Sequence, residues 1–262
     1  MALPAAIMLL AFFVLPLVHL VIIGASGSDG LAAYPVALLE RRHLESLGET
    51  LVLSIVVTLV TLILGGVPAL FLERNAFRGR ALLVSVLSLP LAFPGVVVGF
   101  LVILLAGRQG IVGQVSQLAG GPRIVFAYSV TGLLVGYVYF SIPRVVLTIM
   151  ASAHMLDHQL EEAARSLGAS PWRVFRDVIV PGLRPALIAA GAVCFATSMG
   201  AFGTAFTLAT RIDVLPMVIY TEFTLGTNLA AATGLSLMLG AVTWATLAFA
   251  RSVSGANVAA AG

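Results

Sequence analysis

Residues 160–181 read LEEAARSLGASPWRVFRDVIVP and lie between two strongly apolar blocks. Two glutamates, an aspartate, three arginines and a tryptophan fall in this stretch, although only 10% of the whole chain is charged. Apolar runs are expected in a chain with so few charged residues, so the polar insert is the feature that needs an explanation. Spacing alone leaves two explanations open: a plain connector between two membrane helices, or a segment with a role of its own.

The first half of this insert has the pattern of an amphipathic helix. Its apolar residues recur at the i, i+3, i+4 and i+7 spacing of one helix face, namely Leu160, Ala163, Ala164 and Leu167. Glu161 and Arg165 stand four positions apart with the acid nearer the N-terminus, which is the favourable orientation for an ion pair along a helix. We therefore predict a helix here.

The second half of the insert predicts a turn and a second, short helix. Gly168 stands where a helix commonly ends in a left-handed residue. Ser170 and Pro171 form an N-cap followed by proline at the first helical position. Trp172 and Phe175 are then three positions apart on one face.

Composition places the chain in a membrane. The chain has 262 residues, of which 60% are hydrophobic, whereas soluble domains are about 45–50% apolar and about 25% charged. Its 14 basic residues are all arginine and are scattered, so no nucleic-acid surface is indicated. The single Cys194 excludes an internal disulfide, and the four dispersed histidines form no metal site.

Six apolar runs are each long enough to cross about 30 Å of hydrocarbon as a helix. We predict a single all-α membrane domain over residues 1–262, with spans at about 3–25, 51–72, 81–106, 124–150, 185–209 and 229–250. Residues 26–50 are expected outside the membrane, and residues 151–184 form a helix-turn-helix loop. The first run lacks a preceding basic segment, which favours a retained helix over a signal peptide.

Two further features of the spans can be read from the sequence. Pro90, Pro94 and nearby glycines interrupt the third run, which predicts a kinked helix that packs closely or lines a cavity. Arg144 is expected near the far end of the fourth span, with its side chain reaching the membrane interface.

The distribution of arginine predicts the orientation. With six spans, the face that carries the insert and both termini has nine arginines, and the opposite face has five. Because basic residues concentrate on the cytoplasmic side, the insert and both termini are expected in the cytoplasm.

The insert also carries a motif that resembles the EAA signature of bacterial binding-protein-dependent ABC importer permeases. The motif consists of Glu162-Ala163-Ala164, three residues, Gly168, nine residues, and then Val178, Val180 and Pro181. The two valines replace the isoleucine and leucine of the family pattern, and the spacing is complete. Residues 214–222 and 107–110 look like the group of permeases for polyamines, 2-aminoethylphosphonate, ferric iron and thiamine.

The resemblance implies a type I importer permease of the bacterial inner membrane that is not itself an enzyme. Such a permease pairs with a second permease subunit, two ABC ATPases that bind ATP and Mg²⁺, and a periplasmic binding protein. Residues 170–175 match the coupling helix that docks on an ATPase. The residues expected to take part in docking are Glu162, Ala163, Gly168, Ala169, Ser170, Pro171, Trp172, Arg173, Phe175 and Arg176. The chain needs no cofactor of its own, and without lysine it has no P-loop.

The sequence gives less information about the solute. No acid lies inside an apolar run to attract a cation, and in this family specificity usually rests with the binding protein. We expect the solute to pass a group of residues in the fifth and third spans, namely Ser198, Phe202, Thr204, Phe93 and Pro94, although packing also explains each of them. The resemblance favours a polyamine such as spermidine or putrescine, or a related small molecule; the alternative is a secondary transporter or channel without ATP. An intramembrane enzyme is disfavoured because His19, the one histidine within a span, has no obvious partner.

Overall fold

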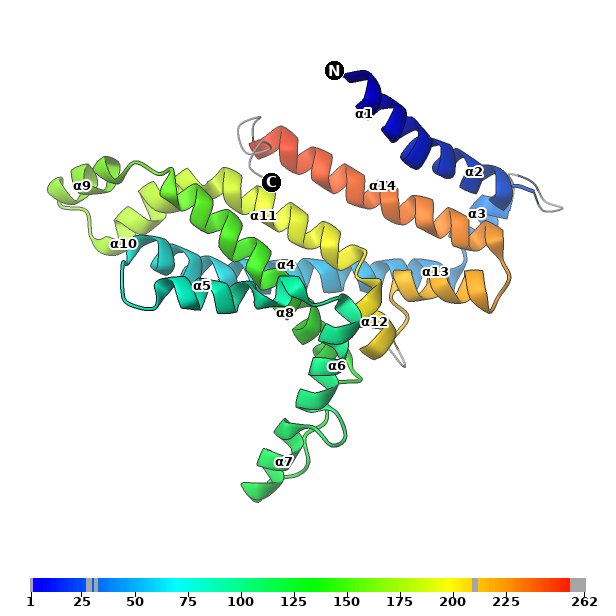
Figure 1. Cartoon of the computed structure of the whole chain (residues 1–262), viewed down its shortest axis with the longest axis horizontal. Helices are drawn as coiled ribbons and strands as arrows, with labels where there is room; N and C mark the ends of the chain where they lie inside the picture. Colours follow the sequence, from blue (N-terminus) through cyan, green and yellow to red (C-terminus); the bar gives the residue numbers. More distant parts are fainter. Residues whose placement is uncertain (1, 27–29, 31–32, 209–211, 255–262) are drawn as a thin grey trace. The chain divides into compact units, whose positions relative to one another are not determined.

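The computed structural model describes residues 2–26, 30, 33–208 and 212–254, and every regular element among them is helical (Figure 1). Six helical segments within this part are long and apolar enough to cross a membrane: Leu3–Gly24, Arg41–Arg74, Gly95–Leu118, Val130–His154, Pro171–Met199 and Leu229–Val253. The predicted all-α fold with six spans is therefore confirmed.

The chain divides into two compact units, of which the smaller covers residues 1–51 and 213–242. Its helices are α1 (Ala2–Leu9), η1 (Leu10–Val14), α2 (Leu15–Gly24), α3 (Ala33–Leu38), the start of α4 (Arg41–Arg74), α13 (Leu215–Thr224) and the first half of α14 (Leu229–Ser254). Leu215, Val218 and Leu235 form its buried core. The backbone N–H of Leu215 donates to Thr50 Oγ1 at 2.8 Å and so joins α13 to α4.

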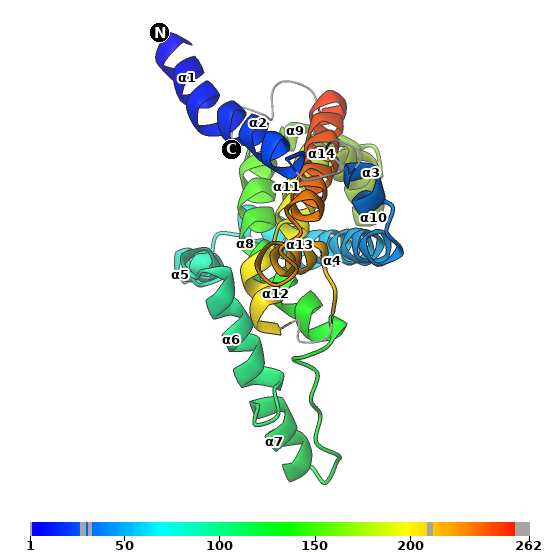
Figure 2. The ribbon, with the colours of Figure 1, turned by 90° about the vertical axis from the view of Figure 1, so that its right-hand side faces the viewer.

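The larger unit covers residues 52–212 and 243–262. Besides the remainders of α4 and α14, its helices are α5 (Arg80–Ser88), η3 (Leu89–Ala92), α6 (Gly95–Ala106), α7 (Ile111–Leu118), α8 (Val130–His154), α9 (His158–Ser166), α10 (Pro171–Val174), η4 (Phe175–Ile179), α11 (Val180–Met199) and α12 (Phe202–Leu208). Helix α8 packs against α11 and α6, and α6 packs against α12 (Figures 1 and 2).

Small residues bring α6, α8 and α12 unusually close. A Cβ atom placed on Gly99 would lie 1.6 Å from Thr207 Oγ1, and one on Gly136 would lie 2.9 Å from Thr204 Cγ2. Thr204 Oγ1 also donates to the carbonyl oxygen of Gly95 at 3.0 Å. Close approach through glycine is a common way for helices to associate in a membrane, where burial of apolar surface gives little driving force.

The third span differs from the predicted run of 81–106. The chain forms α5 and η3, breaks at Phe93, and starts again as α6 after Pro94. Phe93 is extended, with φ −97° and ψ 131°, because a residue before proline is pushed out of the helical region. The candidate span is therefore 95–118, which continues through α7, and 80–92 is a separate short apolar helix.

The fifth span also differs from the predicted run of 185–209. The helix runs from Pro171 to Met199, so the predicted short helix at 170–175 is the first turn of a long one. The π-helical turn η4 absorbs Pro181, which lacks an N–H, and the Val180 N–H donates to the Phe175 carbonyl five residues back. The predicted end at residue 209 lies outside the described residues.

Several other predicted bounds require correction. Helix α4 already begins at Arg41, so the second half of the predicted extramembrane segment 26–50 is largely helical; residues 27–29 and 31–32 lie outside the described part. Helix α8 spans Val130–His154 rather than 124–150. Arg144 consequently lies well inside α8 and not near its end.

Candidate docking site

The insert folds as the predicted helix, turn and second helix. Asp157 caps α9 by accepting the backbone N–H of Gln159 at 2.9 Å. Gly168 has a φ of +80°, the left-handed conformation expected where a helix ends. Ser170 Oγ accepts the backbone N–H of Arg173 at 3.4 Å, and Pro171 is the first residue of α10. Local sequence chemistry therefore sets the bend between α9 and α10.

A buried carboxylate anchors α9 to the end of α4. Glu161 is only 4% exposed and accepts hydrogen bonds from both terminal nitrogens of Arg74, one of them at 2.9 Å. The predicted pair of Glu161 with Arg165 is also present, at 3.6 Å. The contact with Arg74 spans 87 residues of sequence, so no local spacing could have predicted it.

A second ionic cluster joins the ends of α4, α5 and α8. Glu73 accepts a hydrogen bond from Arg80 Nη2 at 2.8 Å and contacts Nδ1 of His154 at 2.7 Å. The ends of four helices that meet near the insert are thus held by two residues that are neighbours in sequence: Glu73 contacts Arg80 and His154, and Arg74 contacts Glu161.

The face of the insert that points away from these anchors is apolar and open. Leu160, Leu167 and Trp172 are 59%, 89% and 67% exposed. The rings of Trp172 and Phe175 stack with centroids 5.6 Å apart, which holds the tryptophan in one orientation. The remaining predicted docking residues surround this face; Glu162, Ala163, Arg173 and Arg176 are exposed, and Ala169 is half-buried.

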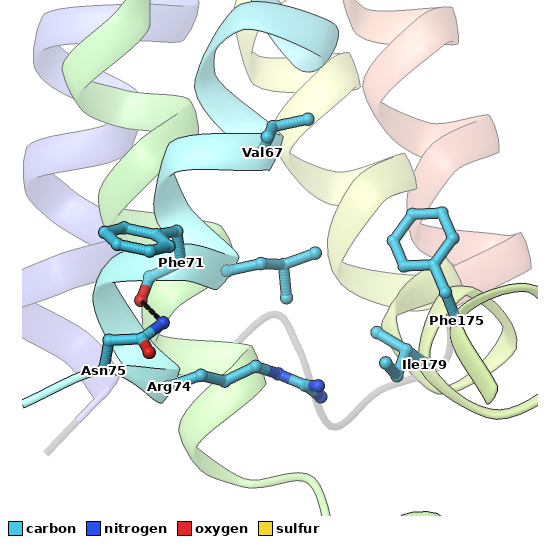
Figure 3. Close-up of a pocket in the computed structure, with 7 residues that line it drawn as sticks. Val67, Phe71, Arg74, Asn75, Phe175 and Ile179 are labelled. Carbon is cyan, nitrogen blue, oxygen red and sulfur yellow. Dashed lines mark hydrogen bonds between the residues drawn. The ribbon is translucent and has the colours of Figure 1, made fainter. Parts of the chain in front are cut away.

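A groove of about 280 Å³ separates the end of α4 from α10 and η4 (Figure 3). Its walls are mostly apolar, with Arg74 and Asn75 at one end, and the lining residues are Val67, Leu70, Phe71, Arg74, Asn75, Phe175 and Ile179. Asn75 donates to the Phe71 carbonyl at 2.8 Å and so closes the last turn of α4. The insert is therefore tied to α4 at Glu161 and stands apart from it along this groove.

The structure gives the predicted solute-pathway residues a packing role. Thr204 is 2% exposed and uses its hydroxyl on Gly95, directly after the break at Phe93 and Pro94. Ser198 is also 2% exposed and donates to the Cys194 carbonyl of its own helix. Thr204 of α12 thus contacts the first residue of α6, which follows Phe93 and Pro94 directly in sequence.

Phe202 and Pro94 are not fully enclosed by the chain. Phe202 is half-buried and its ring lies 5.5 Å from that of Phe206, and Pro94 is exposed. A role of these residues in solute passage stays a prediction.

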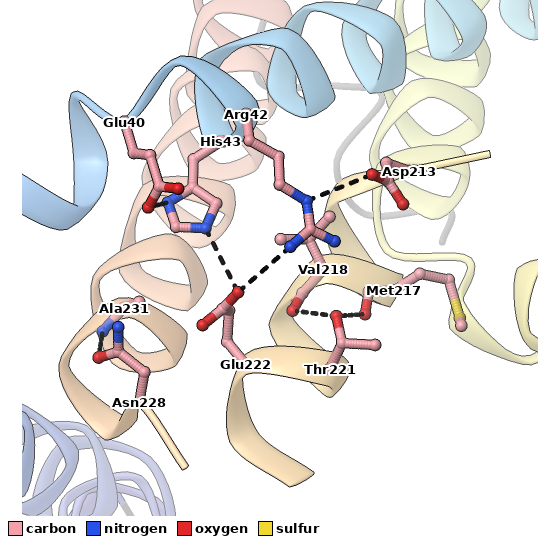
Figure 4. Close-up of polar contacts among 10 residues, drawn as sticks. All are labelled: Glu40, Arg42, His43, Asp213, Met217, Val218, Thr221, Glu222, Asn228 and Ala231. Atoms are coloured by element: carbon pink, nitrogen blue, oxygen red, sulfur yellow. Dashed lines mark hydrogen bonds and ion pairs between the residues drawn. The ribbon is translucent and has the colours of Figure 1, made fainter. Parts of the chain in front are cut away.

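The smaller unit holds a charged cluster that sequence reasoning missed (Figure 4). Arg42 lies 3.3 Å from Asp213 and 3.7 Å from Glu222. His43, which is 1% exposed, lies 3.6 Å from Glu40 and 3.7 Å from Glu222. These contacts tie the start of α4 to α13. Among the described residues no group of three potential metal ligands occurs.

These features together define a class of protein. The described part of the chain has six helical spans and an insert that a buried ion pair fixes to one of them, and this insert exposes an apolar face. This combination is typical of a membrane transport subunit that binds partner proteins.

Residues 62–256 match the family described as "Binding-protein-dependent transport system inner membrane component", and the chain belongs to this family.

Similar curated proteins transport inorganic anions. The chain is 39% identical over 157 residues to the molybdenum transport system permease protein ModB of Escherichia coli K12, covering 58% of this chain and 68% of that protein. It is 31% identical over 198 residues to the sulfate transport system permease protein CysW of Synechocystis, covering 74% and 71%. It is also 33% identical to the chloroplastic sulfate permease 2 of Chlamydomonas reinhardtii, covering 77% of this chain and 56% of that one.

Solved structures support the fold. A bacterial alginate ABC transporter, solved with an alginate-bound periplasmic protein, matches with a TM-score of 0.81 at 19% identity, covering 96% of this chain and 91% of that one. The MetNI methionine ABC transporter matches with a TM-score of 0.61 at 16% identity, covering 82% and 96%. The predicted family is thus confirmed, whereas none of the relatives described here supports the narrower polyamine group.

Proposed function

We propose that this chain is the membrane-spanning subunit of an ATP-driven importer, and that the insert of α9 and α10 is where an ABC ATPase docks. Two ATPases, a second permease subunit and a periplasmic binding protein complete the assembly. The observation that carries the proposal is the exposed Trp172, stacked on the half-buried Phe175, on a segment that Glu161 anchors to α4. Aromatic side chains flanked by arginine are frequent anchors of protein interfaces.

The anchoring explains how movement of an ATPase would reach the membrane. Helix α10 continues through η4 into α11 without interruption, so a push on Trp172 acts directly on a membrane-spanning helix. Helix α9 is fixed to the end of α4 by Glu161 and Arg74. Two spans would therefore move with the insert as rigid bodies, which is how alternating access is commonly achieved.

The same proposal fixes the orientation. An ATPase is cytoplasmic, so the insert and both termini face the cytoplasm. Arginine counts support this assignment even after Arg144 is removed from the loop count, because eight arginines remain on the insert side and five on the other.

For the solute, we propose a small tetrahedral oxyanion of the kind named for the relatives, such as molybdate or sulfate. The described spans favour an anion over a polyamine, because their acidic residues lie near helix ends and leave no carboxylate in mid-membrane for a cation. The predicted group of polyamines, 2-aminoethylphosphonate, ferric iron and thiamine supplies the competing solutes for the test.

The test is uptake by the complete complex in proteoliposomes, with the cognate binding protein outside and ATP inside. Radiolabelled molybdate and sulfate are offered beside spermidine, 2-aminoethylphosphonate, ferric iron and thiamine. We expect uptake of an oxyanion and none of spermidine. Uptake of spermidine without either oxyanion would contradict the proposed solute, while leaving the ATP-driven mechanism intact.

A further inference from the structure

Arg144 is a cation in the middle of a membrane-spanning helix. It is ten residues from the end of α8 at His154, which corresponds to about 15 Å along the axis. A contact between neighbouring helices fixes this depth. A Cβ on Gly182 would lie 2.7 Å from Leu156, so the start of α11, where Arg184 lies, is level with the end of α8. Arg184 is therefore near the α9 end of the span, and Arg144 lies far from it.

The side chain of Arg144 points away from the nearer membrane surface. Its Nη1 donates to the carbonyl oxygen of Phe140 at 2.8 Å, one turn back toward the start of α8. Its guanidinium carbon lies 4.3 Å from the centre of the Phe140 ring, which holds the group in place by a cation–π contact. An arginine that reached for the α9-side interface would extend toward His154 instead. The expectation of an interfacial Arg144 is therefore wrong.

No carboxylate neutralises this guanidinium within the described part of the chain. Every arginine that forms an ion pair in this part of the chain is an arginine other than Arg144. Within the same part, Phe140 is the only residue with which Arg144 forms a hydrogen bond or a cation–π contact. Ionisable groups in membrane spans face a protein interior or a water-filled cavity, because exposure to lipid is costly. This chain covers the face of Arg144 only in part: Arg144 is half-buried, Ser141 one turn before it is buried and Leu147 is 38% exposed, whereas Val145 and Ile149 on the other side are fully buried.

We propose that Arg144 lines the aqueous passage between the two permease subunits and binds the oxyanion as it crosses. This inference rests on the proposed function and deepens it by naming a contact for the solute. A guanidinium presents several N–H groups in one plane, so it can donate two parallel hydrogen bonds to an oxyanion. Phe140 and its carbonyl occupy one side of the group and leave the other nitrogens available. A single cation, rather than a cluster, attracts the anion and still allows its release.

The charge series Arg144→Lys, Arg144→Gln and Arg144→Glu tests this role in the complete complex. We expect oxyanion uptake at least tenfold lower for Arg144→Gln and abolished for Arg144→Glu. For Arg144→Lys we expect a raised KM with a partly retained maximum rate. Retention of the ATPase on purification should not change, because Arg144 lies far from the insert. The matched control is Arg78→Gln, which removes an exposed arginine outside the spans and should transport normally.

Thiol labelling separates failure of this inference from failure of the proposed function. With Cys194→Ser as background, an Arg144→Cys variant should react with a membrane-impermeant anionic methanethiosulfonate, and a Leu104→Cys variant on the apolar surface of α6 should not. Wild-type oxyanion uptake together with normal uptake by Arg144→Gln, or an unreactive thiol at position 144, would overturn the inference. Absence of oxyanion uptake by the wild type would overturn the proposed solute, and with it the anion assigned to Arg144, even if position 144 is labelled.

Discussion

The contact between Glu161 and Arg74 best illustrates what single residues contribute. Glu161 is the side chain through which the insert is fixed to α4, and it is nearly inaccessible to water. A buried carboxylate that accepts two hydrogen bonds from one guanidinium is held in a defined direction, unlike an exposed ion pair. The direction of α9 relative to the end of α4 therefore depends on two side chains.

Removal of one partner of this pair should be costly. For Arg74→Gln we expect a loss of about 3 kcal/mol, because Glu161 stays buried, loses both of its hydrogen bonds from Arg74, and keeps only the longer 3.6 Å contact with the exposed Arg165. The loss should appear as a lower melting temperature of the purified complex and as weaker coupling of ATP hydrolysis to uptake. In a double-mutant cycle with Glu161→Gln, the second substitution should cost much less than the first.

An exposed pair provides the control for that experiment. Arg41 and Glu45 are 2.7 Å apart, but their side chains are 92% and 60% exposed. Such pairs contribute under about 1 kcal/mol, so Arg41→Gln should leave the melting temperature unchanged. Equal effects of Arg41→Gln and Arg74→Gln would contradict the anchoring role.

At this scale the sequence predicted what is local. The Glu161–Arg165 pair, the left-handed Gly168 and the Ser170 cap each depend on spacings of a few residues, and all are present. The clusters around Arg74 and Arg42 depend on tertiary contacts between distant segments, so spacing could not reveal them.

At the scale of helices, proline and glycine decide where spans break and how closely they pack. Pro94 ends the helix that composition alone extends through it, and Pro181 is absorbed by a π-helical turn instead of ending one. A hydropathy profile predicts neither the helix end at Pro94 nor the π-helical turn at Pro181, since both depend on backbone hydrogen bonds. The number of spans was therefore predictable, whereas the bounds of the third and fifth were not.

The close approach of α6 and α12 makes a second prediction. Gly99→Ala would place a methyl group where Thr207 Oγ1 lies, at 1.6 Å, so the two helices would have to separate. We expect a loss of about 1–3 kcal/mol, as for other overpacked sites, measured as a lower melting temperature in detergent.

Gly240→Ala is the matched control, because no atom lies within 4 Å of a Cβ at that position in α14. It should be neutral or slightly stabilising, since alanine favours a helix over glycine. A Gly99→Ala variant as stable as Gly240→Ala would show that the α6–α12 approach is looser than described.

The continuous helix from α10 to α11 makes a third prediction. Trp172→Asp should remove the main apolar anchor of the docking face without changing the fold, because this side chain is 67% exposed. We expect the purified permease to lose its ATPase and transport to fall to background. Leu225→Asp, at a 79% exposed position after α13, serves as control and should retain the ATPase. Full retention by Trp172→Asp would remove the basis for docking at this face.

For the whole molecule, the sequence predicted the membrane class, the span number and the family, but its indication of solute has no support. The stretch 214–222 that suggested a polyamine group begins with Val214, Leu215 and Val218, all at most 1% exposed, in the core of the smaller unit. Gly107 and Gly110 form the turn between α6 and α7. Because these residues serve packing and the link between two consecutive helices, their resemblance carries information about fold and little about the solute.

The central claim is that this chain imports its solute only when an ATPase docked on the insert hydrolyses ATP. The most direct measurement is solute uptake by proteoliposomes that contain the whole complex, with the loaded binding protein outside and either ATP or ADP enclosed. We expect uptake with ATP, background with ADP, and background with ATP for Trp172→Asp. Equal uptake with ATP and ADP would contradict it and would favour a transporter or channel that is not driven by ATP.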